Sequence, residues 1–465
     1  MLKNDLLDQW DRENFFHPST HLAQHARGDS PSRVIKTASG VYIEDRDGHK
    51  LLGAFAGLYC VNAGYGRQEI TDAIAAQAKE LAYYHSYVGH GTEASITLSK
   101  MILDRAPANM SKVYFGLGGS DANETNIKLI WYYNNILGRP EKKKIISRMR
   151  AYHGVTIASA SLTGLPWVHN DFDLPIANVL HTSCPHYYRH GQEGETEEQF
   201  AARMAQDLED MILREGPETI AAFVFEPVVG AAGGCVPAPD GYAKLVREIC
   251  TKYGVLMISD EVMCGAGRTG TWRALAYDGV EPDIMSVAKG LAAGYVPLGA
   301  AICTTAVWEV IRAKDGAFGT GHTFTGHTAA CAAGVAVQKI IARDGLLAKV
   351  AANGDRLKGW MADALAGVDS IGDIRGRGHF ICAELVADRA TKAPYDAARQ
   401  LHLKVRAQAM ENGLICYPVG GNVDGSAGDI VILAPPYNCT DDELTEIVDK
   451  TARSIRQVLA AEGLG

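Results

Sequence analysis

The chain of 465 residues lacks the features that define several large classes of protein. It contains no Cys-x-x-Cys pair, and its ten cysteines are scattered without metal-ligand spacing, so we expect reduced thiols and no metal site. No apolar run approaches the length of a membrane span, and the acidic stretch 1–10 lacks the apolar core of a signal peptide. These absences favour a cytoplasmic protein that does not contact a membrane.

Positive charge is also scarce. The sequence has 45 lysines and arginines against 54 acidic residues, a net charge of −9, and no basic stripe that would bind nucleic acid. A hydrophobic content of 47% with 21% charged residues is typical of a soluble globular protein. The length exceeds what one ordinary core can bury, so we expect two or more domains.

Strands and helices alternate between residues 113 and 290, which predicts an α/β fold with a doubly wound, mainly parallel sheet. We expect this large domain to span residues 61–340 and a smaller α+β domain to span residues 341–465. The segment 1–60 contains a hairpin with Asp47-Gly48 at its turn, and we expect this segment to join the smaller domain.

Two predicted strands end on residues that carry chemistry. The run Val255–Asp260 is apolar until its acidic end, and Ile284–Ala288 is followed directly by Lys289. Each residue alone is more often a solvated strand end, but open α/β sheets place ligands at the carboxyl ends of their strands. An amine and a carboxylate there suit pyridoxal phosphate (PLP), because the amine binds its aldehyde and the carboxylate pairs with its ring nitrogen.

A glycine-rich stretch, Phe115–Asn126, leads from a strand into a helix and predicts a phosphate site. Glycines admit an anion to the backbone, the helix start offers free N–H groups, and Ser120 adds a hydroxyl. The stretch is not a dinucleotide fingerprint, because Asp121 stands where the last glycine is needed. An oxidoreductase with that fingerprint is therefore disfavoured.

Further candidates follow other predicted strands. Tyr152-His-Gly154 offers an aromatic face that could stack on a flat ring, although a core tyrosine is an equally ordinary interpretation. Glu226 ends another strand with a third acid. The loop Gly319–His327 is rich in hydroxyls and glycine, which fits either a phosphate contact or a surface loop.

The order and spacing of these motifs over almost the whole chain resemble the class III aminotransferases, which are fold type I PLP enzymes. The motifs that carry the resemblance are the glycine-serine phosphate loop, Tyr152-His-Gly, Glu226-Pro, Asp260-Glu-Val with Gly265–Gly270, Ala288-Lys-Gly and His322–His327. Within that class, Phe55–Gly66 and Pro435-Pro436 are similar to ω-transaminases that use pyruvate.

The resemblance implies a role for each matching residue. Lys289 would hold PLP covalently and move a proton, and Asp260 would pair with the ring nitrogen. The other cofactor contacts it implies are Gly119, Ser120, Tyr152, His153, Glu226 and Val262, with Thr323 supplied by a second subunit. The implied substrate pocket is lined by Tyr59, Tyr87, Tyr152 and Ala231. The resemblance therefore implies a homodimer, or a dimer of dimers, with active sites at the interface.

The sequence departs from the family pattern in places, and one of these departures bears on the substrate. The phosphate loop reads Gly118-Gly-Ser120 where relatives usually have Ser-Gly-Ser, and no arginine lies between Tyr417 and Pro435. Many relatives use an arginine there to bind a substrate carboxylate, so a keto acid here needs another cation or is recognised more weakly. An aromatic pocket with the small Ala231 favours apolar, bulky or long-chain primary amines as donors, with pyruvate as acceptor in a ping-pong reaction.

Several alternatives remain open at this point. The donor could instead be a short ω-amino acid, a diamine or a taurine-like compound, and the same fold also supports aminomutases and decarboxylases. With amine alone, a transaminase stops at pyridoxamine phosphate (PMP) until a keto acid is added. A non-catalytic PLP-binding or scaffold protein is a third hypothesis, and the presence of both Lys289 and Asp260 argues against it.

Overall fold

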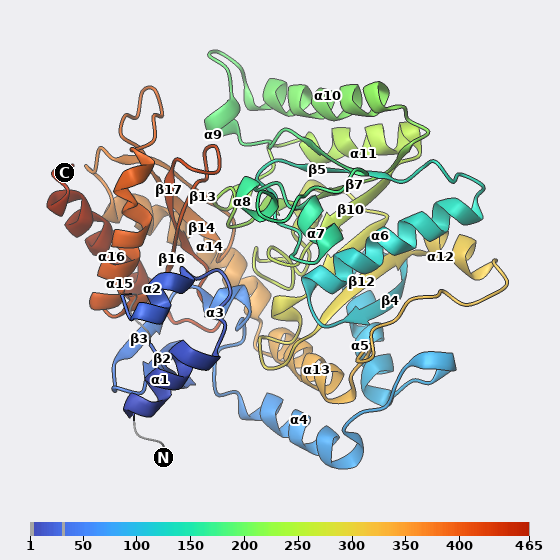
Figure 1. The fold of residues 1–465 in the computed structure, drawn as a ribbon, viewed down its shortest axis with the longest axis horizontal. Helices are drawn as coiled ribbons and strands as arrows, with labels where there is room; N and C mark the ends of the chain where they lie inside the picture. Colours follow the sequence, from blue (N-terminus) through green and yellow to red (C-terminus); the bar gives the residue numbers. More distant parts are fainter. Residues whose placement is uncertain (1–3, 30–32, 465) are drawn as a thin grey trace.

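The computed structural model describes residues 4–29 and 33–464 (Figure 1). The stretch 1–10 was expected not to be a signal peptide. Its first three residues, 1–3, lie outside the described residues. A large α/β body and a smaller α+β part lie side by side, as the sequence predicted (Figure 1). Within residues 4–29 and 33–464, no helix has both the length and the apolar character that crossing a membrane requires.

The large body is built on a seven-stranded sheet. Four neighbouring pairs of strands are parallel, and only β12 runs antiparallel to its neighbours β11 and β4. This arrangement confirms the predicted mainly parallel sheet. In spatial order the strands are β4 (Met110–Gly116), β12 (Gly299–Thr304), β11 (Ile284–Val287), β10 (Leu256–Asp260), β7 (Ile220–Phe225), β5 (Lys144–Arg148) and β6 (Val179–Thr182).

Helices cover both faces of this sheet, because alternate strand residues point to opposite sides. Phe223 and Phe225 pack with α10 (Glu197–Glu215) and α11 (Tyr242–Tyr253). Ala222 and Val224 pack with α6 (Gly119–Ile136) and α12 (Thr305–Arg312) on the other face. Strand β7 is therefore buried along its whole length. The body is completed by α4 (Gln68–Leu81), α5 (Glu93–Leu103), α7 (Ile157–Leu162), α8 (Pro166–His169), α9 (Tyr187–His190), α13 (Thr328–Arg343), β8 (Val228–Val229) and β9 (Val236–Pro237).

The smaller part joins segments from both ends of the chain. Strand β3 (Lys50–Gly53) pairs in parallel with β15 (Leu414–Ile415), and Leu52 and Leu414 share one buried core with Val431. The hairpin of β2 (Tyr42–Asp45) and β3 therefore pairs with this part. Its other elements are α1 (Asn4–Asn14), α2 (Leu22–Arg27), β1 (Ile35–Ser39), α3 (Ala56–Tyr59), α14 (Leu346–Ala364), β13 (Ile371–Gly376), β14 (Ile381–Leu385), α15 (Leu401–Glu411), β16 (Tyr417–Gly420), β17 (Asp429–Leu433) and α16 (Asp441–Ala461). The domain limits at residues 60 and 340 stay predictions.

Candidate active site

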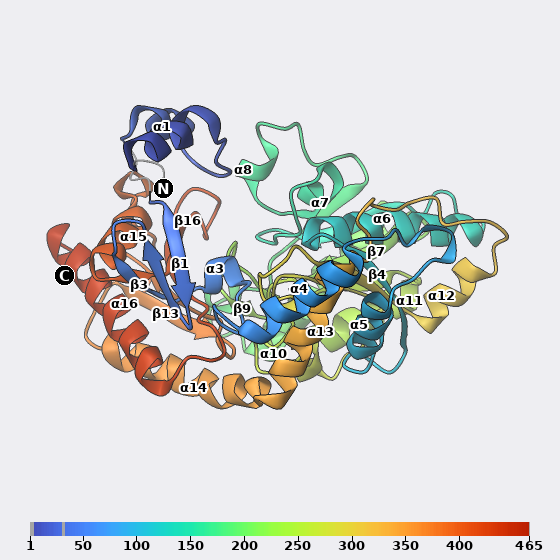
Figure 2. The same cartoon turned by 90° about the horizontal axis from the view of Figure 1, so that it is seen from below.

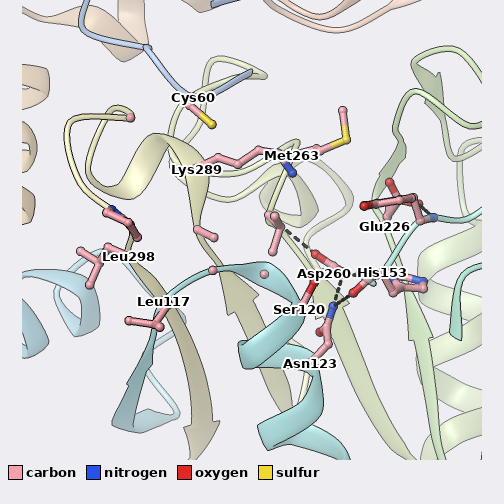
Figure 3. A pocket seen from close by; sticks show the side chains of 18 of the residues that line it. Cys60, Leu117, Ser120, Asn123, His153, Glu226, Asp260, Met263, Lys289 and Leu298 are labelled. Carbon is pink, nitrogen blue, oxygen red and sulfur yellow. Dashed lines mark hydrogen bonds and ion pairs between the residues drawn. The ribbon is translucent and has the colours of Figure 1, made fainter. Parts of the chain in front are cut away.

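A cavity of about 260 Å³ lies at the carboxyl ends of β5, β7, β10 and β11 (Figure 3). Parallel strands bring their ends to one edge of the sheet, so residues far apart in the sequence meet there. The start of α6 and Cys60 also line the cavity. The lining residues are Cys60, Leu117, Gly118, Gly119, Ser120, Asn123, Tyr152, His153, Gly154, Glu226, Asp260, Val262, Met263, Ala288, Lys289, Gly294, Val296, Pro297 and Leu298.

Lys289 extends its side chain into this cavity from the turn after β11 (Figure 3). Its backbone lies in the left-handed region, with φ of 45°. Burial lowers the pKa of the Lys289 amine, and the nearby Cys60, Asp260 and Glu226 partly offset this shift. A lowered pKa increases the fraction of neutral amine, which is the form that attacks a carbonyl carbon.

The residue after Lys289 has to be glycine. A Cβ atom on Gly290 would lie 1.8 Å from Nδ2 of Asn62, which comes from the segment after α3. Asn62 Oδ1 in turn accepts a hydrogen bond of 2.6 Å from the buried Arg268. The Ala-Lys-Gly motif therefore reflects a close approach of two distant segments behind the lysine.

Asp260 is held by a network that joins β10, β11, α6 and the loop after β5 (Figure 3). Its Oδ2 atom accepts a hydrogen bond of 2.7 Å from Asn123 Nδ2 and lies 2.7 Å from His153 Nδ1. Its Oδ1 atom accepts one of 3.0 Å from the backbone N–H of Val262. Asn123 is itself fixed, because its Oδ1 accepts a bond of 2.7 Å from the Ser286 hydroxyl. The carboxylate at the floor of the cavity therefore has one defined orientation.

Glu226 joins two backbone segments at the cavity wall. Its Oε1 atom accepts a hydrogen bond of 3.0 Å from Tyr152 N–H, and its Oε2 atom accepts one of 2.8 Å from Gly230 N–H. Burial raises the pKa of Glu226, and the nearby His153 partly counters this shift. Arg148 donates a bond of 2.6 Å to the backbone carbonyl of Glu226. Glu226 therefore positions Tyr152 through its backbone.

The start of α6 has the features of an anion site. Gly118 precedes the helix, and no side chain caps its first N–H groups. The Ser120 hydroxyl oxygen accepts a bond of 3.1 Å from Val155 N–H, which leaves its proton available to donate. A Cβ atom on Gly119 would lie 2.8 Å from Val262 Cγ1, so a larger residue would close the space. Free N–H groups and the helix dipole favour a phosphate at this place.

These observations fit PLP. The cavity holds an amine without a hydrogen-bond partner among the described residues, an oriented carboxylate and an anion site at a helix start. When bound, PLP supplies an electron sink next to the reacting carbon. Lys289 Nζ would bind the cofactor and carry the proton, Asp260 would pair with the ring nitrogen, and Gly119 with Ser120 would hold the phosphate. Tyr152 and Val262 line the space between them.

The structure brings most of the predicted cofactor residues together and leaves four predicted residues outside the cavity of a single chain. Tyr59 is buried against Phe55, Phe380 and Tyr417, in the same apolar cluster as Ala231. Of the other two, Thr323 lies within the largely exposed loop 319–327, and Tyr87 lies close to Gly321 of that loop. The pocket role of these four residues stays a prediction.

Tyr87 and Thr323 lie on one surface of the chain. A Cβ atom on Gly321 would meet the Tyr87 hydroxyl at 2.6 Å, and the Thr323 carbonyl accepts a hydrogen bond from the Tyr83 hydroxyl. The predicted contact of Thr323 with a phosphate was assigned to a second subunit. Thr323 does not line the cavity of its own chain, and its contact with a second subunit's phosphate stays a prediction.

Asn123 and Cys60 line the cavity but were not predicted from the sequence as site residues. Asn123 lies three residues after Ser120, so the helical period would have placed both side chains on one face of α6. Cys60 had no such signal. It follows a turn in which Ala56, Leu58 and Tyr59 adopt positive φ angles, and this local backbone is not legible in the sequence.

Comparison with known proteins points in the same direction as this geometry. The family model "Aminotransferase class-III" matches residues 23–455. A diaminobutyrate–2-oxoglutarate transaminase of Halomonas elongata is 47% identical over 98% of this chain and 97% of its own length.

Two solved structures are similar over nearly the whole chain. A transaminase from a study of directed evolution by ancestral reconstruction superimposes with a TM-score of 0.95 at 46% identity, covering 99% of this chain and 100% of its own. The ω-transaminase of Pseudomonas jessenii in complex with PMP superimposes with a TM-score of 0.93 at 38% identity, covering 99% of each chain.

Proposed function

The chain belongs to the class III aminotransferases, and from this premise we propose that it transfers the amino group of a carboxylate-free primary amine to an α-keto acid, with pyruvate preferred. Enzymes of this class use PLP, and the residues around Lys289 fit that cofactor. The proposed donors include bulky and long-chain amines. The proposed reaction is ping-pong, with donor and acceptor using the same cavity in turn.

The composition of the cavity wall supports the choice of donor. No arginine is among its lining residues, and Leu117, Met263 and Leu298 make part of the wall apolar. Burying a carboxylate without a partner costs roughly several kcal/mol, because the charged group loses its hydration. An apolar group instead gains about 25 cal/mol per Å² that it buries.

Arg150 is our candidate for the cation that the acceptor carboxylate needs. It does not line the cavity itself, but it lies two residues before Tyr152, which does, and it is 8% exposed. Its guanidinium makes a single hydrogen bond, of 3.4 Å, to the carbonyl of Gly421, and forms no ion pair among the described residues. Burial lowers the pKa of Arg150, and the carboxylate of Asp424 partly offsets this. A nearly buried guanidinium with unused donors beside the 421–428 loop supports binding of a small keto acid there.

Replacing Arg150 by methionine should raise the KM for pyruvate by about 10-fold to 100-fold, the usual effect of losing hydrogen bonds to a charged group. Reactions with aldehyde acceptors, which carry no carboxylate, should keep their KM. Stopped-flow measurement of the two half-reactions separates these effects. Arg139→Met, at an exposed position, is the matched control. An unchanged KM for pyruvate in Arg150→Met would assign the carboxylate to another cation.

A second candidate donor is a short ω-amino acid or a diamine. The relative from Halomonas elongata is named for diaminobutyrate and 2-oxoglutarate, and Arg150 would attract the carboxylate of such a donor as well. A panel of amines, β-alanine, 4-aminobutyrate and diaminobutyrate with pyruvate or 2-oxoglutarate decides between the two. Higher kcat/KM for the amino acids would show that the donor is a short ω-amino acid or a diamine and not a carboxylate-free amine.

Ala231→Phe should lower kcat/KM for large amines by about 10-fold or more and change it little for small ones, because the added ring fills apolar space. Ala231 packs in the cluster that contains Tyr59 and Tyr417, at the proposed substrate side of the cavity. The matched control is Ala313→Phe, at an exposed position after α12. If both variants keep the wild-type ranking of amines by size, Ala231 does not form the pocket.

We also propose that the enzyme is a cytoplasmic homodimer, or a dimer of dimers. Tyr87, Val88 and Phe324 are large apolar side chains that lie exposed near Thr323, and their burial by a second copy would bring Thr323 to that copy's phosphate site. Light scattering tests the state of assembly, and cell fractionation tests the compartment. Incubation with amine alone tests the aminomutase and decarboxylase alternatives, because those enzymes turn over without a keto acid.

A further inference from the structure

A group of potential metal ligands lies in the N-terminal arm, which we define as residues 4–27. Asp11 belongs to α1, His25 belongs to α2, and His17 lies in the connection between the two helices. The arm lies beyond strand β1, at the edge of the molecule (Figure 2). None of these three residues lines the active-site cavity. The group is therefore separate from the aminotransferase site.

The three side chains converge on one point. Nε2 of His17 lies 2.8 Å from Oδ1 of Asp11, and Nε2 of His25 lies 3.2 Å from Oδ2 of the same carboxylate. The two imidazole rings pack edge to face with centroids 4.5 Å apart. All of the potential ligand atoms lie within 4.8 Å of one another. Two imidazoles and one carboxylate are a common ligand set for Zn²⁺.

His25 shows that hydrogen bonding does not account for the whole arrangement. Its side chain is buried, and its Nε2 atom has no hydrogen bond of acceptable geometry although it faces Asp11. Ligand atoms at about 2.1 Å from a tetrahedral ion lie about 3.4 Å from one another. The distance of 3.2 Å between His25 Nε2 and Asp11 Oδ2 is close to that value.

We propose that Asp11, His17 and His25 bind one Zn²⁺ ion that ties α1 to α2. Three protein ligands leave a fourth position for water. The ion would satisfy the buried nitrogen of His25 and stabilise the fold of the arm, since a ligand that binds only the folded form favours it. No metal site was expected from the sequence, because its cysteines show no metal-ligand spacing.

In a second group, Asp45, Asp47 and His49, the potential ligand atoms also lie close enough together to hold a metal ion. In that group the buried carboxylate of Asp45 is already bound by Arg33, at 2.7 Å, and by the backbone N–H groups of Asp47 and His49. Asp47 and His49 are exposed. The arm site is therefore the better candidate, and His49 serves as the control position.

The test is calorimetric titration of the full-length enzyme, loaded with PLP and freed of any histidine tag, with Zn²⁺ alone. We expect one ion per chain with about micromolar affinity, and a loss of at least about tenfold in His17→Gln and in His25→Ala. His49→Ala should bind as the wild type does. Titration with Co²⁺ should give the visible absorption of a tetrahedral site in the wild type and not in the double variant His17→Gln/His25→Ala.

Limited proteolysis gives a readout that does not depend on activity. Zn²⁺ should slow cleavage within residues 4–27 in the wild type and not in the double variant. Equal Zn²⁺ binding by the wild type and the double variant would overturn the proposal, as would a loss of binding in His49→Ala alone. No binding by a wild type whose circular dichroism shows it to be folded would overturn it as well.

Discussion

Lys289→Ala is expected to reduce turnover by about 10⁴-fold or more, because it removes the one amine that we propose both binds the cofactor and moves the proton. The lysine extends into the cavity, and its amine has no hydrogen-bond partner among the described residues, so its removal leaves the surrounding contacts intact. The variant should therefore stay folded and still bind PLP non-covalently. Steady-state rates, circular dichroism and the absorption of bound cofactor measure the three quantities.

The assignment of Lys289 has an independent check. Borohydride reduction of the wild type followed by peptide mapping should find the cofactor on the peptide that contains Lys289. Small primary amines added to Lys289→Ala should restore part of the rate, because they supply the missing base from solution. Cofactor attached to another lysine would refute the role, whatever the rate of the variant.

Asp260→Asn is expected to reduce the rate of the first half-reaction by about 10³-fold, or about 4 kcal/mol in the barrier. A neutral amide does not stabilise a positive charge on the ring nitrogen of PLP, so the cofactor becomes a weaker electron sink. The amide also places a donor opposite Asn123 Nδ2, which donates to Asp260 in the wild type. Single-turnover measurements with saturating amine report the chemical step.

Glu261→Gln is the matched control for Asp260→Asn. Glu261 is the next residue along the chain, but its carboxylate accepts hydrogen bonds from the N–H groups of Ala274 and Leu275 and does not line the cavity. Burial raises the pKa of Glu261. Its substitution should lower the free energy of unfolding while sparing the rate per cofactor-loaded molecule. Equal rate losses in both variants would mean that fold damage, not ring electronics, explains Asp260→Asn.

Much of the large domain was predictable from local pattern. The strands that end at Asp260 and before Lys289 are apolar runs because both faces of a parallel sheet are covered, and the structure shows helices on both faces. The antiparallel direction of β12 was not predicted, because its residues Gly299–Thr304 are as fully buried as those of a parallel strand. Strand direction depends on how the preceding turn crosses the sheet, and hydrophobic pattern does not encode it.

The residues of the candidate site also fall into those that were predictable from local pattern and those that were not. Residues at strand ends, such as Lys289, Asp260 and Glu226, were found because their chemistry interrupts an apolar run. Asn123 and Cys60 were not found, because a polar helix residue and a loop cysteine have no distinctive local setting. Their place at the cavity follows from how α6 and the turn at residues 56–59 pack on the sheet.

The sequence by itself determined the class of protein, the α/β sheet and the residues that we propose to bind the cofactor, because apolar runs, glycine turns and strand-end side chains are local features. Only the tertiary structure decided which polar partners orient Asp260, where Arg150 lies relative to the 421–428 loop and how Asp11, His17 and His25 converge. These are contacts between segments that fold together from different parts of the chain. Their distances depend on packing, and packing is set by the whole chain at once.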